Sequence, residues 1–96
     1  MPSDNKALRE LYQLFSSIES EKESELLLRD ILTPQELETI AERWQLIQGL
    51  GSGMTQRDTA KKYGVSISKI TRGSHMLQHG SGGFGHFLKK LKMTRP

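Results

Sequence analysis

The stretch TQRDTAKKYGVSISKITRGSHML, residues 55–77, decides the fold because it has the pattern of two short helices joined by a tight turn. Thr55 is a suitable N-cap for the first helix, and Asp58 three residues later nearly completes a capping box. Gly64 stands where a helix ends in a left-handed residue, a conformation that glycine adopts at low cost. The sequence thus predicts a short helix that ends at a glycine turn.

A second helix is expected after this glycine. Ser66 can cap it, and Ile70 returns one apolar side chain to the core between polar neighbours. The small Ala60 on the first helix lets a second helix cross closely, and its spacing to Gly64 and Ile70 is typical of a helix-turn-helix. An ordinary helical hairpin in a small bundle is the alternative interpretation.

The charge of the chain is divided between its two halves. Residues 1–53 carry five Lys or Arg and ten Asp or Glu, whereas residues 54–96 carry nine Lys or Arg and a single acidic residue, Asp58. The basic residues of the second half are Arg57, Lys61, Lys62, Lys69 and Arg72 in the helix pair, and Lys89, Lys90, Lys92 and Arg95 in the tail. A basic half that contains a candidate recognition helix indicates binding to the phosphates of nucleic acid.

Size and composition limit the classes of protein to consider. A chain of 96 residues predicts a single domain over residues 1–96. No apolar run approaches the ~20 residues that cross a bilayer, the N-terminus lacks a signal-peptide pattern, and there is no cysteine, so we expect a cytoplasmic protein without a membrane partner. With 34% hydrophobic residues the chain has modest means to build a core, which favours a dimer that shares its helices.

Apolar residues recur at helical spacing in the rest of the chain, and no segment alternates with a period of two. The sequence therefore predicts an all-α fold. Beyond residues 55–77, helices are expected around four apolar sets: Leu8, Leu11, Tyr12, Phe15 and Ile18; Leu26, Leu27, Leu28, Ile31 and Leu32; Leu37, Ile40, Ala41, Trp44 and Ile47; and Phe84, Phe87, Leu88 and Leu91. Thr33 and Glu36 form a capping box before the third set. The residues of this set should be buried, and the glycines of residues 49–53 should loosen or stop the helix that carries them.

An enzyme is the least favoured class of function. The chain has no cysteine, no cluster of metal ligands and no acid–base pair at a convincing spacing, so we expect no catalytic residue. His75 and His79 have the spacing of a two-histidine half-site on a helix, but no third ligand is evident and no metal is expected.

The chain resembles the bacterial tryptophan repressor family over roughly residues 8–92. The likeness is carried by Leu32-Thr33-Pro34, Arg43, Thr55-Gln56-Arg57, Gly64 and Ile70-Thr71-Arg72-Gly73-Ser74. It implies an all-α, six-helix chain of the intertwined-dimer type with a helix-turn-helix. It also implies a homodimeric transcriptional repressor that binds a palindromic double-stranded DNA operator, with L-tryptophan as corepressor.

The same resemblance implies the residues of the ligand site. Arg43 and Arg72 match arginines whose planar guanidinium groups sandwich the indole ring, and Arg72 also meets the ligand carboxylate, which suits guanidinium chemistry. Leu32 and Thr33 match positions that close the pocket from the partner subunit, and Gly73 matches a glycine that lets the ligand approach the backbone.

Met76 departs from the family pattern. It stands where the family has a serine that helps hold the amino group of the ligand, and a thioether is a poor acceptor for an ammonium group. Losing that hydrogen bond costs roughly 1.5–3 kcal/mol, about one to two decades of affinity. The sequence leaves three alternatives for the pocket: weak tryptophan binding, a preference for an indole acid without the amine, or no ligand at all.

On the DNA side, the resemblance places Ile67, Ser68, Lys69 and Thr71 toward base edges and Arg57 toward a guanine. Ala60 departs from a family lysine, and Lys61 supplies charge one place later. The full expected DNA-binding set is Arg57, Lys61, Ile67, Ser68, Lys69, Thr71 and Ser74. The rival functions are a constitutive or differently liganded helix-turn-helix DNA-binding protein, and a protein-interaction module.

Overall fold

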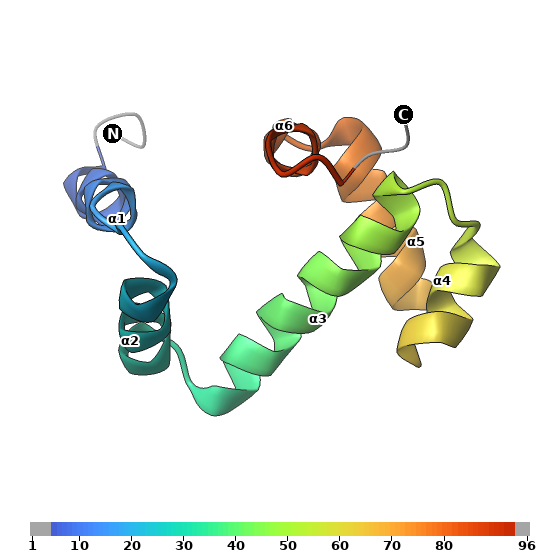
Figure 1. Ribbon diagram of the computed structural model, residues 1–96, viewed down its shortest axis with the longest axis horizontal. Coiled ribbons are helices and arrows are strands. Elements are labelled where there is room, and N and C mark those ends of the chain that lie inside the picture. Colours follow the sequence, from blue (N-terminus) through green and yellow to red (C-terminus); the bar gives the residue numbers. More distant parts are fainter. Residues whose placement is uncertain (1–4, 94–96) are drawn as a thin grey trace. The chain divides into compact units, whose positions relative to one another are not determined.

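The computed structural model describes residues 5–93, and these residues form six α-helices and no strand (Figure 1). The helices are α1 (Lys6–Ser16), α2 (Glu21–Ile31), α3 (Pro34–Gly51), α4 (Gln56–Tyr63), α5 (Ile67–His79) and α6 (Gly83–Lys90). The predicted all-α class is confirmed. Arg95, counted in the basic tail, lies outside the described residues.

The chain divides into two compact units, one up to Leu37 and the other from Glu38 onward. The first unit contains α1, α2 and the start of α3, and the second contains the rest of α3 with α4, α5 and α6. The single domain expected over residues 1–96 stays a prediction, and each unit is described by itself.

In the first unit, residues 5–37 form capped helices without a buried core. Asn5 accepts a hydrogen bond from the Leu8 amide at 3.0 Å, and Ser20 accepts one from the Glu23 amide at 3.1 Å, which satisfies free N–H groups at the start of α1 and α2. Glu23 in turn accepts from the amide of Glu19, so the charged segment before Leu26 is the solvated start of α2. No residue of α1 or α2 is buried, and the apolar stripe of α1 is exposed.

Helix α3 begins with the predicted capping box. The Glu36 amide donates to Thr33 Oγ1 at 3.1 Å, and the Thr33 amide donates to Glu36 Oε1 at 2.8 Å. The helix continues through Gly49 to Gly51. Gly49 is held within it by close packing, since a Cβ at this position would lie 3.0 Å from side-chain atoms of both Thr59 and Tyr63. The chain turns after Gly51, at a stretch that includes Gly53 with a φ of 98°.

The core of the second unit lies where α4, α5 and α6 pack against the C-terminal half of α3. Its buried apolar residues are Leu46, Ile47, Val65, Ile70 and Leu88. The buried Thr59 donates its hydroxyl hydrogen to the Thr55 carbonyl oxygen at 2.8 Å, so the start of α4 is tied to this core.

Burial on α3 differs from the sequence prediction. Of the five residues expected to be buried, Ile47 is buried, Leu37 and Trp44 are half-buried, and Ile40 and Ala41 are exposed in the single chain. The reason is that the buried contacts of α3 begin at Leu46, one to two turns beyond Ile40. The apolar face of α3 is therefore longer than the part of it that the rest of the chain buries.

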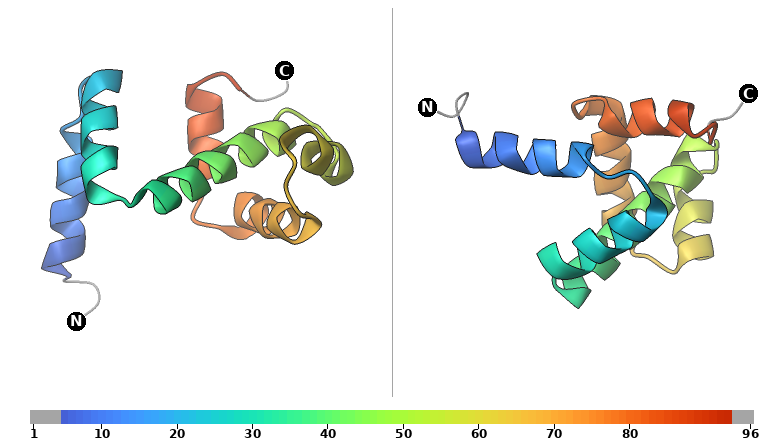
Figure 2. Two further views of the ribbon diagram at one scale, coloured as in Figure 1. Left: turned by 90° about the horizontal axis from the view of Figure 1, so that it is seen from below. Right: turned by 60° about the vertical axis from the view of Figure 1, so that its left-hand side comes forward.

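Helices α4 and α5 lie side by side and form the predicted helix pair (Figures 1 and 2). Thr55 accepts from the Asp58 amide at 3.0 Å, and Ser66 accepts from the Lys69 amide at 3.3 Å. Gly64 closes α4 in the left-handed conformation, with φ 64° and ψ 35°. Both caps and the glycine turn are thus confirmed, and Ile70 is fully buried as expected.

Candidate functional site

The residues of α5 fall on different faces of the helix. Because a helix has 3.6 residues per turn, Ile67, Ser68, Thr71 and Ser74 share one side, while positions 69, 72, 73 and 76 share another. Ile70 points into the core between them. The expected DNA-binding set is therefore divided, since Lys69 lies on the side of the ligand-site residues.

The first side of α5 is open to solvent together with residues of α4. Arg57, Lys61, Ile67, Ser68 and Thr71 are exposed, and Ser74 is half-buried. Ile67 is 55% exposed although it is apolar. Arg57 and Lys61 are one turn apart on α4, so they share a face of that helix. These exposed side chains include polar, apolar and cationic groups, which can contact base edges and phosphates.

A cavity of about 310 Å³ lies between α3 and the second side of α5. One face of α3, one face of α5 and one ring of α6 form its walls. The lining residues are Thr39, Glu42, Arg43 and Leu46 on α3, Lys69, Arg72, Gly73 and Met76 on α5, and Phe84 on α6. Four predicted ligand residues are among them, namely Arg43, Arg72, Gly73 and Met76. The other two, Leu32 and Thr33, belong to the first unit and do not line this cavity.

Gly73 on α5 lies against a side chain of the opposite wall. It is buried in α5, and a Cβ at this position would collide with Cδ1 of Leu46 on α3. The resemblance implied that this glycine lets a ligand approach the backbone. The structure shows that it also leaves room beside α5 for the buried Leu46 side chain of α3.

The cavity carries an excess of positive charge. Lys69 Nζ lies 2.8 Å from Glu42 Oε1, and this is the one ion pair between different helices in the part of the chain that the structure describes. Arg43 and Arg72 form no ion pair with any residue from 5 to 93. With three cations and one carboxylate on its walls, the cavity suits a ligand that carries an anionic group.

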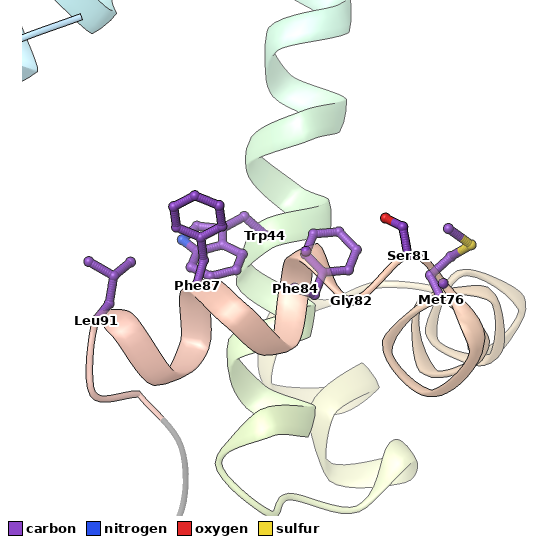
Figure 3. Close-up of a pocket in the computed structure, with 9 residues that line it drawn as sticks. Trp44, Met76, Ser81, Gly82, Phe84, Phe87 and Leu91 are labelled. Atoms are coloured by element: carbon purple, nitrogen blue, oxygen red, sulfur yellow. The ribbon is translucent and has the colours of Figure 1, made fainter. Parts of the chain in front are cut away.

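Met76 lines a second cavity as well as the first. This second cavity, of about 580 Å³, is bounded by Trp44 on α3, Met76 on α5, the segment 80–83, and Phe84, Phe87 and Leu91 on and just after α6 (Figure 3). Its walls are largely apolar, and the rings of Trp44 and Phe84 are stacked with centroids 6.2 Å apart. Phe87 and Leu91, expected on an amphipathic helix, are about half exposed here.

The sequence did not single out Glu42. An acidic residue beside Arg43 has the pattern of an ordinary solvated helix face, and the pairing with Lys69 spans 27 positions of the chain. Only the register between α3 and α5 brings the two together, and no local signal in the sequence encodes that register.

The two histidines of α5 lie next to each other. The rings of His75 and His79 have centroids 5.0 Å apart. No group of three or more metal-ligating side chains occurs among residues 5–93. Within the same range, no helix is both long and apolar enough to cross a membrane.

The sequence matches known proteins over most of its length. The family model described as Trp repressor protein matches residues 6–92. A Trp operon repressor homolog from Chlamydia trachomatis serovar L2 is 39% identical over 84 residues, which cover 82% of this chain and 89% of that protein. Another from Xylella fastidiosa strain M23 is 35% identical over 89 residues, covering 92% and 95% of the two chains.

Solved structures share the fold. A TrpR-like protein from Eubacterium eligens superposes with a TM-score of 0.89 at 25% identity, covering 97% of this chain and 96% of that one. A candidate Trp repressor from Staphylococcus aureus superposes with a TM-score of 0.90 at 22% identity, covering 99% and 95%. The latter likeness concerns the fold alone.

Proposed function

The chain belongs to the Trp repressor family of DNA-binding transcriptional regulators, which are not enzymes, and we propose that L-tryptophan controls it as corepressor. In this proposal the protein is a homodimer that binds a palindromic operator in double-stranded DNA. The observation that carries it is the arrangement of α5, which has a solvent-exposed side next to α4 and a cationic cavity on its other side. A ligand in that cavity would touch the helix that reads DNA.

The proposed DNA surface combines α4 and α5. Ile67, Ser68 and Thr71 near the start of α5 would face base edges, with Ser74 further along the same side. Arg57 and Lys61 on α4 would contact a guanine and the phosphates. Access to DNA would place the protein in the cytoplasm of a bacterium.

The proposed ligand site uses the guanidinium groups of two arginines that form no ion pair with residues 5–93. Arg43 on α3 and Arg72 on α5 stand on opposite walls of the cavity, so an indole ring between them would stack on both planes. Arg72 would also bind the ligand carboxylate through two N–H groups. Leu32 and Thr33 would complete the site from the partner subunit.

The proposed homodimer has support in the exposed apolar surface of the chain. Leu8, Leu11, Tyr12 and Phe15 on α1 are all more than a third exposed, and so are Phe87 and Leu91 beside the larger cavity. Exposed apolar surface of this extent is typical of protein interfaces. A second copy would cover it and would set two recognition helices about one DNA turn, ~34 Å, apart. Light scattering that shows only monomer at micromolar concentration would contradict this part of the proposal.

Met76 supports a second candidate, a constitutive or differently liganded DNA-binding protein of the same fold. Met76 lines the cavity, and its thioether replaces the family serine that would accept from the ligand's amino group. In this alternative the protein binds DNA equally well with and without tryptophan.

One binding experiment separates the two candidates. Duplexes enriched from a random library by the purified protein would be tested for affinity with and without L-tryptophan. We expect palindromic sequences, and a rise in affinity with tryptophan within the typical allosteric range of about 5- to 150-fold. Palindromes bound with unchanged affinity would favour the alternative, and a lack of any duplex binding would contradict both.

Arg57→Ala tests the assigned surface. We expect the variant to lose about 1–3 kcal/mol of binding free energy, because Arg57 would no longer contact a base. Lys22→Ala is the matched control, since it removes one positive charge from an exposed position on α2. Fluorescence anisotropy at modest salt would measure both, and an Arg57→Ala affinity equal to that of the control would reject this surface.

A further inference from the structure

The ion pair between Glu42 and Lys69 lies inside the proposed ligand site. Lys69 Nζ is 2.8 Å from Glu42 Oε1, and both residues line the same cavity as Arg43 and Arg72. Among the described residues that line the cavity, Glu42 is the one that carries a carboxylate. An ammonium group is thus already bound at this carboxylate, in a cavity whose other charged groups are guanidinium cations.

The charges on these walls match a zwitterion. An α-amino acid carries an ammonium and a carboxylate on one carbon, so a cavity with both an anionic and a cationic group can bind both of its charges. Glu42 and Arg72 are such partners, on α3 and α5 respectively. The Lys69 ammonium occupies the carboxylate that the ammonium of such a ligand would use.

The pair is open to replacement. The side chains of Lys69 and Glu42 are 59% and 35% exposed, and ion pairs with that exposure to water contribute little to stability. A ligand ammonium brought to Glu42 can therefore replace Lys69 at small cost. The flexible stem of a lysine allows its ammonium to move away from α3 while α5 stays in place.

We propose that Glu42 binds the ammonium group of an α-amino acid ligand and thereby releases Lys69 for contact with DNA phosphate. This inference rests on the proposed function, because it assumes a ligand at Arg43 and Arg72 and DNA at α4 and α5. It assigns to Glu42 the acceptor role that Met76 cannot fill. It also separates two ligand classes, since an acid without an amine binds the arginines but leaves the Glu42–Lys69 pair intact.

The Glu42→Gln variant tests the first half of the inference. Calorimetric titration would compare L-tryptophan with indole-3-propionate, which has no amine. We expect the variant to bind tryptophan about 10- to 100-fold more weakly than the wild type, because one hydrogen bond between charged groups is lost. Its affinity for indole-3-propionate should change by no more than about threefold. Equal losses for both ligands, or no loss for tryptophan, would overturn the role of Glu42.

The Lys69→Gln variant tests the competition. Removing the lysine frees Glu42, so tryptophan should bind up to about fivefold more tightly, the limit set by the small contribution of an exposed pair. Lys62→Gln is the control for lost charge, since Lys62 lies on α4 and does not line the cavity. Tryptophan binding by Lys69→Gln that is unchanged or weaker would overturn the competition.

The salt dependence of DNA binding tests the release of Lys69. Tryptophan should steepen the slope of log K against log salt for the wild type by about 0.9 for each Lys69 that gains a phosphate, and indole-3-propionate should not. An identical slope with both ligands overturns the release. If the wild type binds neither ligand but still binds DNA, the inference is overturned while the DNA-binding part of the proposed function stands.

Discussion

The two units of this chain use the same local chemistry but differ in what they bury. Both contain amphipathic helices with side-chain caps, such as Ser20 on α2 and Thr55 on α4. Among the described residues, only those of the unit from Glu38 onward form a core, in which Leu46, Ile47 and Ile70 meet. The difference shows that caps and apolar periodicity suffice to form helices, whereas a core requires apolar faces from several elements at one place.

The difference also separates two kinds of apolar residue. Those of the second unit's core stabilise the single chain by leaving water. The stripe of α1 leaves water only in part in the single chain, since Leu8, Leu11 and Phe15 are each about two-fifths exposed. We infer that this stripe serves association, in accordance with the proposed homodimer.

The largest expected effect comes from truncating a side chain of the core. Ile70→Ala should lower the free energy of unfolding by about 2–5 kcal/mol, because Ile70 is fully buried and its removal leaves a cavity. Leu11→Ala should cost the single chain no more than about 0.5 kcal/mol, as is usual for surface positions. Urea unfolding monitored by circular dichroism measures both.

Repeating these unfolding measurements at several protein concentrations separates the two variants further. If α1 is covered by a second copy, the effect of Leu11→Ala should depend on concentration, and that of Ile70→Ala should remain large when the protein is diluted. Equal losses for the two variants in dilute protein would show that α1 belongs to the core of the single chain.

The sequence predicts most reliably those features that depend on a few neighbouring residues. The capping box of Thr33, the cap at Thr55 and the left-handed turn at Gly64 were predicted from two or three positions each, and all are confirmed. Their chemistry is local, because a side-chain oxygen reaches an amide three residues away and a positive φ favours glycine whatever surrounds it.

Features that depend on the register between helices were not predicted. The pairing of Glu42 with Lys69 and the close approach of Gly73 to Leu46 both depend on how α5 lies against α3. The exposure of Ile40 has the same origin, since periodicity marks an apolar face without showing which part of it the chain covers. Of the ligand site, the resemblance predicted the arginines, and the role of each residue stays a prediction.

The next largest effect on stability is expected from replacing two glycines of the second unit with alanine. Gly64→Ala should destabilise the protein by about 1–2 kcal/mol, because the residue has a φ of 64° and a side chain is strained there even though nothing lies within 4 Å of the added Cβ. Gly85→Ala is the matched variant, since it also adds a Cβ in open space but lies within α6. It should gain up to about 1 kcal/mol of helix propensity. Losses of equal size in thermal unfolding would reject backbone conformation as the cause.

The smallest expected effect comes from removing an N-cap side chain, which can be compared between the two units. Ser20 accepts from the Glu23 amide at 3.1 Å, and Thr55 accepts from the Asp58 amide at 3.0 Å, so replacing either with alanine removes one cap worth about 1 kcal/mol. Because buried Thr59 ties Thr55 to the core, we expect Thr55→Ala to lower the free energy of global unfolding by that amount. Ser20→Ala should act locally and speed amide hydrogen exchange in the first turn of α2 by about fivefold. Slow-exchanging amides of α5 that respond equally to both variants would show that α2 unfolds together with the core.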